Sequence, residues 1–184
     1  MPFSIPDSFT TVKISDHTGR EFDVVVSRQP DHYEQWLESA RPFSAIAKIL
    51  IQLLQGRGSL IDVGANIGTI SLPVAKNGSR VIAVEMLPIN CMKLSLSVIA
   101  NGLSRMTVHQ AAATNSIQML EFSGDGPWGA VTTGASFPQY AAGYPIDTLL
   151  AALGDTLPAG DVAVKIDVEG HELEVLQGCE DLIA

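Results

Sequence analysis

The pattern D-x-G-x-N-x-G spans residues 62–68 and overlaps a short apolar run at residues 60–63. The run predicts a buried strand, the glycines break it, and residues 70–76 resume with helical spacing. Strand, glycine turn and helix together form the first unit of an open α/β sheet. Ligands of such sheets lie beyond the carboxyl ends of the strands, where glycines let the backbone approach them. The pattern therefore favours a small-molecule site over a turn without a ligand.

The spacing indicates the kind of ligand. A dinucleotide site would have a second glycine where this chain has Asn66, so the pyrophosphate of a nicotinamide cofactor would meet a side chain. Asp62 precedes the glycine turn, and an acid there suits a positively charged group. S-adenosylmethionine (SAM), with its ammonium and sulfonium, is such a ligand. Asn66 has an alternative role as the cap of the following helix.

A second acid, Glu85, ends the next apolar run at residues 81–85. Glu85 stands 85 − 68 = 17 positions after Gly68, close to the spacing of about 20 for the ribose-binding acid of a strand–helix–strand unit. A carboxylate there can accept hydrogen bonds from both ribose hydroxyls. The alternative is a solvated residue at the end of a strand.

Charged residues also interrupt an apolar run at residues 161–168, where Lys165 and Asp167 are followed by Glu169. Because strand residues alternate between faces, these three side chains would share one face. A central parallel strand is normally apolar on both faces, so three charges in register indicate a functional site. In a doubly wound sheet the first and fourth strands are neighbours, which predicts that Asp167 lies near Asp62. A buried Lys165–Asp167 ion pair without chemistry is the alternative.

The rest of the chain supplies the elements that position these groups. Residues 1–58 would form a cap of one β-hairpin and two helices, followed by a core at residues 59–184. Apolar residues within 42–54 and 172–179 recur at helical spacing, which predicts buried helix faces. The patterns predict a hairpin at 9–27, a hairpin or a mobile loop carrying Trp128 from residue 117 onward, with the hairpin at 117–133, helices at 31–40, 42–54, 91–100 and 146–153, and a strand at 107–112.

Composition bounds the class of protein. The 184 residues suffice for one domain with a core, and the net charge of −9 argues against a nucleic-acid partner. The two cysteines predict buried, reduced thiols. No secretory signal or membrane-spanning run is recognisable, so we expect a cytoplasmic protein with no membrane partner.

Four segments carry a resemblance to a known family, and the last is the most diagnostic. Together they resemble the FkbM family of SAM-dependent methyltransferases from about residue 60 onward. The resemblance implies a Rossmann-like class I α/β fold with a mostly parallel, doubly wound sheet, SAM as cofactor, and O-methylation of a hydroxyl on a small molecule or sugar. The segments are Ile-Asp-Val-Gly-Ala-Asn-Ile-Gly (61–68), Val-Ile-Ala-Val-Glu (81–85), Ile-Asp-Thr-Leu-Leu (146–150) and Val-Lys-Ile-Asp-Val-Glu-Gly-His-Glu-Leu-Glu-Val-Leu-Gln-Gly (164–178).

A hydroxyl must lose its proton as it attacks a methyl group, and histidine is the usual base. We expect His171 to be this base, or Asp167 to act directly, with Glu169 orienting the substrate or His171. The alternative for His171 is a solvated residue at a helix start. These are metal-type ligands, so a catalytic divalent metal is an open alternative, but their spacing matches no closed metal motif and we assign no metal site. The residues expected to bind SAM are Asp62, Gly64, Ala65, Asn66, Gly68, Glu85 and Met86.

Two other functions remain open from the sequence. An N- or RNA-methyltransferase shares the glycine turn, but it would usually carry an Asn/Asp-Pro-Pro-aromatic turn where this chain has residues 167–170. A non-catalytic SAM-binding or interaction module is suggested by the chain's stop at Ala184, because the family's fold normally continues with three more strands.

We therefore expect a C-terminally truncated sheet whose fourth strand forms an open, apolar edge. The N-terminal hairpin, a second subunit in a homodimer, or the rest of a longer parent would cover this edge.

Overall fold

Four parallel strands form the central sheet, in the order β10-β3-β4-β5. The first and fourth predicted strands are therefore neighbours, as expected. Their residues are mostly apolar because both faces of a parallel sheet are covered by other elements. The strands are β3 (Ser59–Val63), β4 (Arg80–Glu85), β5 (Met106–Gln110) and β10 (Val162–Ile166). The structure is a computed structural model and describes residues 4–40, 44–123, 130–131, 138–152 and 160–184.

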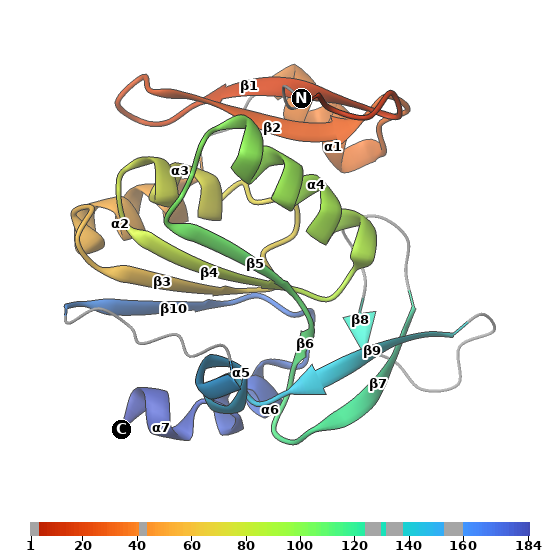
Figure 1. Ribbon diagram of the computed structural model, residues 1–184, viewed down its shortest axis with the longest axis vertical. Helices are drawn as coiled ribbons and strands as arrows, with labels where there is room; N and C mark the ends of the chain where they lie inside the picture. The colour runs from red at the N-terminus through yellow and green to blue at the C-terminus, as the bar shows by residue number, and fades with distance from the viewer. Residues whose placement is uncertain (1–3, 41–43, 124–129, 132–137, 153–159) are drawn as a thin grey trace.

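Helices lie on both faces of this sheet, so the predicted doubly wound, Rossmann-like α/β architecture is confirmed (Figure 1). One buried apolar cluster joins the sheet to α3, α4 and the N-terminal strands, and a second joins the opposite face to α5 and α6. The buried residues of the glycine turn after β3, Ala65 and Ile67, belong to the first cluster. The helices are α3 (Ser71–Lys76), α4 (Pro88–Ala100), α5 (Ile146–Ala152), α6 (Glu172–Gln177) and α7 (Glu180–Ile183).

The predicted N-terminal hairpin is confirmed as antiparallel β1 (Phe9–Ser15) and β2 (Glu21–Ser27). It lies over α4, where the backbone N–H of Val25 donates to the Ser97 hydroxyl at 2.8 Å (Figure 1). The alternative in which this hairpin covers the edge of the central sheet is therefore wrong. Among the described strands, β10 pairs with β3 alone, and its coverage by a second subunit stays a prediction.

Helix α1 (His32–Ala40) follows the hairpin within the predicted range of 31–40, and Asp31 caps it. The carboxylate of Asp31 accepts from the backbone N–H of Glu34 at 2.8 Å, which satisfies one of the free donors at the helix start. The side chain of Leu37 is fully buried, whereas that of Trp36 is exposed. The buried side of α1 thus faces the body of the molecule.

Helix α2 (Ala45–Leu54) starts at the Ser44 cap, and the predicted start at residue 42 lies outside the described residues. The predicted burial is wrong for Ile46 and Leu53, which are 50% and 55% exposed. Helix α2 is apolar around most of its circumference, so helical spacing alone does not identify the side that meets β3, β10 and α3. The buried side chains are those of Ala47, Leu50, Ile51 and Leu54.

Helix α6 shows the same difference. Leu173 and Leu176, whose spacing predicted a buried face, are exposed, while Val175 and Cys179 are buried. Helix α6 has only six residues, which is less than two turns. So short a segment contains too few apolar positions for their spacing to identify the buried side. Cys91 and Cys179 are both free and buried, as predicted. Burial, aided by the charge of Asp147, raises the pKa of Cys179 to about 11.

A second sheet follows β5 and has the order β6-β9-β7-β8. The predicted hairpin at residues 117–133 corresponds to the antiparallel pair β7–β8, with Trp128 outside the described residues, but the sequence did not predict β9. The second sheet extends from the carboxyl edge of β5 to one side of the molecule (Figure 1). Its strands are β6 (Ala112–Ala113), β7 (Gln118–Ser123), β8 (Ala130–Val131) and β9 (Gln139–Tyr144). No helix among the described residues is long and apolar enough to span a membrane.

Candidate functional site

A cavity of about 240 Å³ lies at the carboxyl ends of the central strands. This is the edge at which α/β sheets bind ligands. Eight of the ten predicted site residues line the cavity: Gly64, Ala65, Asn66, Glu85, Met86, Asp167, Glu169 and His171. Asp62 and Gly68 do not. The sequence did not single out two further wall residues, Tyr33 and Thr69.

The glycine turn brings the backbone to the cavity wall. Gly64 has a φ of +74°, which favours glycine, and a Cβ there would collide with the backbone carbonyl oxygen of Asp167. Gly68 has a φ of +91°, and a Cβ would collide with the Leu94 side chain of α4. Gly68 therefore lets the turn pack against α4, whereas Gly64 lets β3 and the end of β10 meet at the site.

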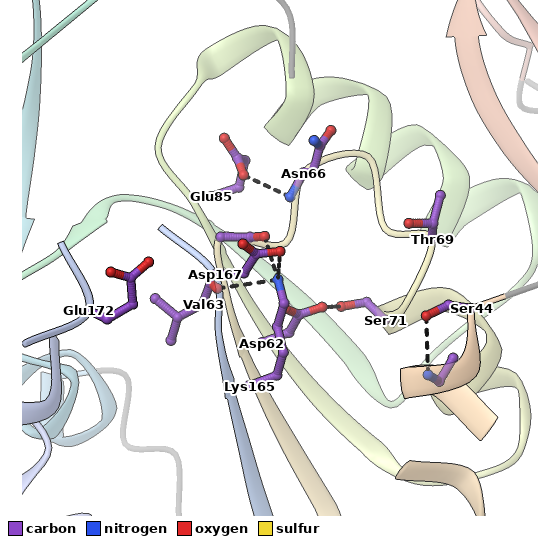
Figure 2. Close-up of polar contacts among 12 residues, drawn as sticks. Ser44, Asp62, Val63, Asn66, Thr69, Ser71, Glu85, Lys165, Asp167 and Glu172 are labelled. Carbon is purple, nitrogen blue, oxygen red and sulfur yellow. Dashed lines mark hydrogen bonds and ion pairs between the residues drawn. The ribbon is translucent and has the colours of Figure 1, made fainter. Parts of the chain in front are cut away.

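Asn66, in the glycine turn, contacts Glu85, at the end of β4, on the cavity wall (Figure 2). The Asn66 backbone N–H donates to Glu85 Oε2 at 2.7 Å, and the Leu87 N–H donates to Oε1 at 2.8 Å. The alternative role of Asn66 as the cap of α3 is wrong, because the cap of that helix is Ile70. Instead, Asn66 has a φ of +53° and aims its N–H at the Glu85 carboxylate.

Burial dominates the electrostatics of Glu85 and raises its pKa above the ordinary value of 4.5. The two backbone hydrogen bonds and the charge of Lys165 oppose this shift, and the charge of Asp62 adds to it. Each carboxylate oxygen has two lone pairs, so Glu85 can still accept from a ligand hydroxyl at each oxygen.

Lys165 links the first and fourth strands of the central sheet (Figure 2). Its Nζ lies 3.0 Å from Asp62 Oδ1 and 3.6 Å from Asp167 Oδ2, and it donates to the Gly64 carbonyl oxygen at 2.8 Å. Asp62 is fully buried and accepts a second bond from Ser71 Oγ at 2.5 Å. The alternative of a buried Lys165–Asp167 ion pair is therefore wrong, because the nearer partner of Lys165 is Asp62, and Asp167 is 65% exposed and lines the cavity.

Strand β10 ends at Ile166, so the predicted alternation does not continue to Glu169. Glu169 adopts a left-handed φ of +52°, and this turn still leaves it on the cavity wall. His171 follows as the residue before α6. The segment therefore reaches the site through an irregular turn rather than through an extended strand.

His171 is held from both ring nitrogens. Its Nε2 lies 3.2 Å from Thr114 Oγ1, and its Nδ1 lies 3.5 Å from Glu174 Oε2. The His171 side chain is only 16% exposed, so the alternative of a solvated histidine is wrong. The carboxylate that orients the ring is Glu174, one turn along α6, rather than Glu169.

Tyr33 reaches the cavity from α1, and its hydroxyl lies 3.1 Å from Thr69 Oγ1. Thr69 belongs to the turn between β3 and α3 (Figure 2). The only sequence signal at Thr69 is a hydroxyl at the end of the glycine turn. Nothing local to Tyr33 indicated a site, because the packing of the hairpin and α1 brings it there.

The charged and apolar residues of the cavity wall suit the groups of SAM. Of the described residues that line it, Glu85, Asp167 and Glu169 are acids, and Lys165 is the one lysine or arginine. An acidic wall suits the ammonium and sulfonium charges, while Glu85 suits the ribose and nearby apolar residues suit the adenine. No three His, Cys, Asp or Glu side chains in the described parts of the chain are grouped so that they could hold a metal ion.

Comparison with protein families assigns the chain. The methyltransferase FkbM domain matches residues 62–184, which is most of the chain and includes every cavity-wall residue that the structure describes except Tyr33. The chain therefore belongs to the FkbM family of SAM-dependent methyltransferases, as its four segments predicted, and SAM is the cofactor of this family. Among the curated proteins the comparison finds no match.

Solved structures of methyltransferases resemble the chain at low identity. The 16S rRNA N2 G1207 methyltransferase RsmC of T. thermophilus, in complex with AdoMet and guanosine, is 22% identical with a TM-score of 0.43; the match covers 59% of this chain and 29% of RsmC. TYW2 of M. jannaschii, in complex with AdoMet, is 15% identical with a TM-score of 0.41, covering 63% of this chain and 55% of TYW2. The chain thus spans less than two thirds of either protein, and the assignment rests on the family match.

Proposed function

We propose that this protein transfers the methyl group of SAM to a hydroxyl group of a small molecule or sugar. The observation that supports this reaction is His171, an oriented and largely enclosed imidazole on the wall of the SAM cavity. A hydroxyl nucleophile needs a base with a pKa near neutrality, and an oriented imidazole is suited to that task. The predicted residues Gly64, Ala65, Asn66, Glu85 and Met86 would hold SAM, because they line the cavity.

When bound, SAM supplies a methyl group activated by its sulfonium. His171 takes the proton of the acceptor hydroxyl at Nε2, where Thr114 Oγ1 now lies at 3.2 Å. Because Thr114 is fully buried, the imidazole must turn from it toward the cavity for the acceptor hydroxyl to become the partner of this nitrogen. Glu174, at 3.5 Å from Nδ1, stabilises the imidazolium that forms. Glu169 lies on the same wall and orients the acceptor.

Asp167 is the other base predicted from the sequence, and its surroundings favour a binding role instead. Lys165 Nζ lies 3.6 Å from its carboxylate and holds it at the cavity wall. An exposed carboxylate in that position is suited to the ammonium of SAM. Asp62 acts indirectly, since it holds Lys165 from behind the wall.

The acidic character of the chain supports a small acceptor rather than RNA. The net charge is −9, and Asp167 and Glu169 add negative charge at the cavity. A polyanionic acceptor would need positive charge there, because phosphate contacts supply most of the affinity for nucleic acid. An amine acceptor would have less need of an oriented base, since it can attack through its own lone pair.

The test is transfer of a labelled methyl group from SAM to a panel of sugar, polyol and phenol acceptors. We expect His171→Gln to lower kcat/KM by about 10²- to 10⁴-fold, the usual contribution of a general base. The variant should bind SAM as the wild type does in calorimetry, because His171 acts on the acceptor. His17→Gln, in the exposed hairpin turn, is the matched control. Transfer to RNA or to amines alone would contradict the proposal.

A further inference from the structure

Among the described residues, the cavity wall includes one from outside the FkbM domain match. Tyr33 lies on α1, whereas the match begins at residue 62. Its hydroxyl lies 3.1 Å from Thr69 Oγ1, and both residues line the cavity. The N-terminal region therefore forms part of the site rather than only covering α4.

A buried ion pair fixes the helix that carries Tyr33. Glu34, the next residue, lies 2.6 Å from Lys93 Nζ of α4, and both side chains are almost fully buried. Glu34 also accepts from the backbone N–H groups of Ser27 at 3.1 Å and Asp31 at 3.2 Å. These contacts tie α1 to the hairpin and to α4, so the position of Tyr33 at the cavity is set by buried contacts.

The paired hydroxyls of Tyr33 and Thr69 retain a donor. Only one of their two hydrogens lies between the two oxygens, so the other can be donated to a third group. Lys165, the cation of the described wall, already contacts Asp62, Asp167 and the Gly64 carbonyl oxygen. An anion entering this part of the cavity would therefore find its donors at the two hydroxyls rather than at a free lysine.

We propose that Tyr33 and Thr69 bind the carboxylate of the amino-acid portion of SAM, an inference that rests on the proposed function. Glu85 on β4 would take the ribose, which directs the amino-acid portion toward β3 and β10, where Thr69 and Asp167 lie. The carboxylate and ammonium of an amino acid share one carbon, so their partners must be close neighbours. Asp167 would face the ammonium and the two hydroxyls the carboxylate.

The electrostatics of Tyr33 agree with this closeness. Burial raises the pKa of Tyr33 above its ordinary value of 10.0, the hydrogen bond to Thr69 opposes the shift, and the charges of Asp31 and Asp167 add to it. Tyr33 therefore lies within range of the Asp167 charge and stays protonated. A protonated phenol is a donor, as a carboxylate requires.

The experiment compares two ligands by calorimetry on the full chain: SAM, and decarboxylated SAM, which lacks only the carboxylate. Tyr33→Phe should weaken SAM binding roughly tenfold, the size typical of a lost hydrogen bond to a charged group. The same variant should bind decarboxylated SAM as the wild type does. Thr69→Val should repeat this pattern, whereas Thr69→Ser, which keeps the hydroxyl, should bind SAM normally. Tyr140→Phe, on the exposed side of β9, is the matched control.

The outcomes separate this inference from the proposed function. Tyr33→Phe and Thr69→Val variants that bind SAM as tightly as the wild type would overturn the inference. Equal weakening for both ligands would also overturn it, because the hydroxyls would then support the cavity without contacting the carboxylate. Either result leaves the methyltransferase proposal intact. Failure of the folded wild type to bind SAM would overturn the proposed function and, with it, the inference.

Discussion

Lys93, which is buried, and Lys165, which is largely buried, each contact a carboxylate, and the two contacts have different roles. Lys93 pairs with Glu34 at 2.6 Å, and water reaches neither side chain to any extent. Lys165 pairs with Asp62 at 3.0 Å, but its second carboxylate, that of Asp167, is 65% exposed and lies on the cavity wall. Both members of the Glu34–Lys93 pair are shielded from water. Lys165 contacts one buried carboxylate and one exposed carboxylate, and we call this arrangement the open pair.

The Glu34–Lys93 pair therefore fixes a helix, whereas Lys165 fixes a carboxylate that faces the cavity. Glu34 has its oxygens occupied by Lys93 and by two backbone N–H groups, so it has little capacity left for a ligand. Asp62 likewise is occupied by Lys165 and Ser71. Asp167 has Lys165 on one side and the cavity on the other. A lysine between a buried and an exposed acid thus fixes the position of the exposed acid at the cavity wall.

The largest effect that tests this comparison is on stability. Lys93→Met leaves Glu34 buried without its cation, so we expect the free energy of unfolding to fall by about 3–5 kcal/mol. Urea unfolding followed by circular dichroism measures the loss. Replacing both partners, as Glu34→Leu with Lys93→Met, should restore much of it, because no charge then remains buried.

Lys13→Met is the matched control, since Lys13 and Asp23 form an exposed pair at 3.1 Å on the hairpin. Its loss should be at most about 1 kcal/mol. If Lys93→Met cost no more than Lys13→Met, the Glu34–Lys93 pair would not be what fixes α1.

The sequence predicted the parts of the site that are local to one strand–turn–helix unit. Gly64, Asn66 and Glu85 could be placed because apolar runs, glycines and acids at strand ends follow one another along the chain. Asp62 was predicted at the same edge, but it is fully buried and contacts Lys165 instead of lining the cavity. Residue type and spacing indicate the edge of a sheet, and they do not indicate which side chains face the cavity and which face the core.

Contacts between distant segments could not be predicted. Glu34 and Lys93 are 59 residues apart, and neither lies in a recognisable motif, so nothing in the sequence pairs them. Tyr33 depends on that contact for its place at the site. Strand β9 was missed because its residues, QYAAGY, do not alternate between apolar and polar, and its position depends on pairing with β6 and β7.

The second prediction addresses the open pair. Lys165→Met removes the cation between Asp62 and Asp167 and the hydrogen bond to the Gly64 carbonyl oxygen. We expect SAM binding to weaken by at least about tenfold, because one charge-assisted contact orders both the glycine turn and Asp167. Calorimetry should show an equal loss for decarboxylated SAM, in contrast to Tyr33→Phe. Normal binding of both ligands by a folded Lys165→Met variant would show that the open pair is only structural.

The smallest expected effect is the pH dependence of SAM binding through Glu85, whose two oxygens are the predicted ribose acceptors. Burial raises the pKa of Glu85 above 4.5, and Lys165 and Asp62 are the charged groups that act on it. The ionised form is the better acceptor, so affinity should fall as the pH decreases through this raised pKa, at a higher pH than for an exposed glutamate. The total loss should be roughly tenfold, the worth of a hydrogen bond to a charged acceptor. In calorimetry at a series of pH values, Glu85→Gln should bind SAM more weakly and without this dependence, and a variant that kept the wild-type pH profile would assign the titration to another group.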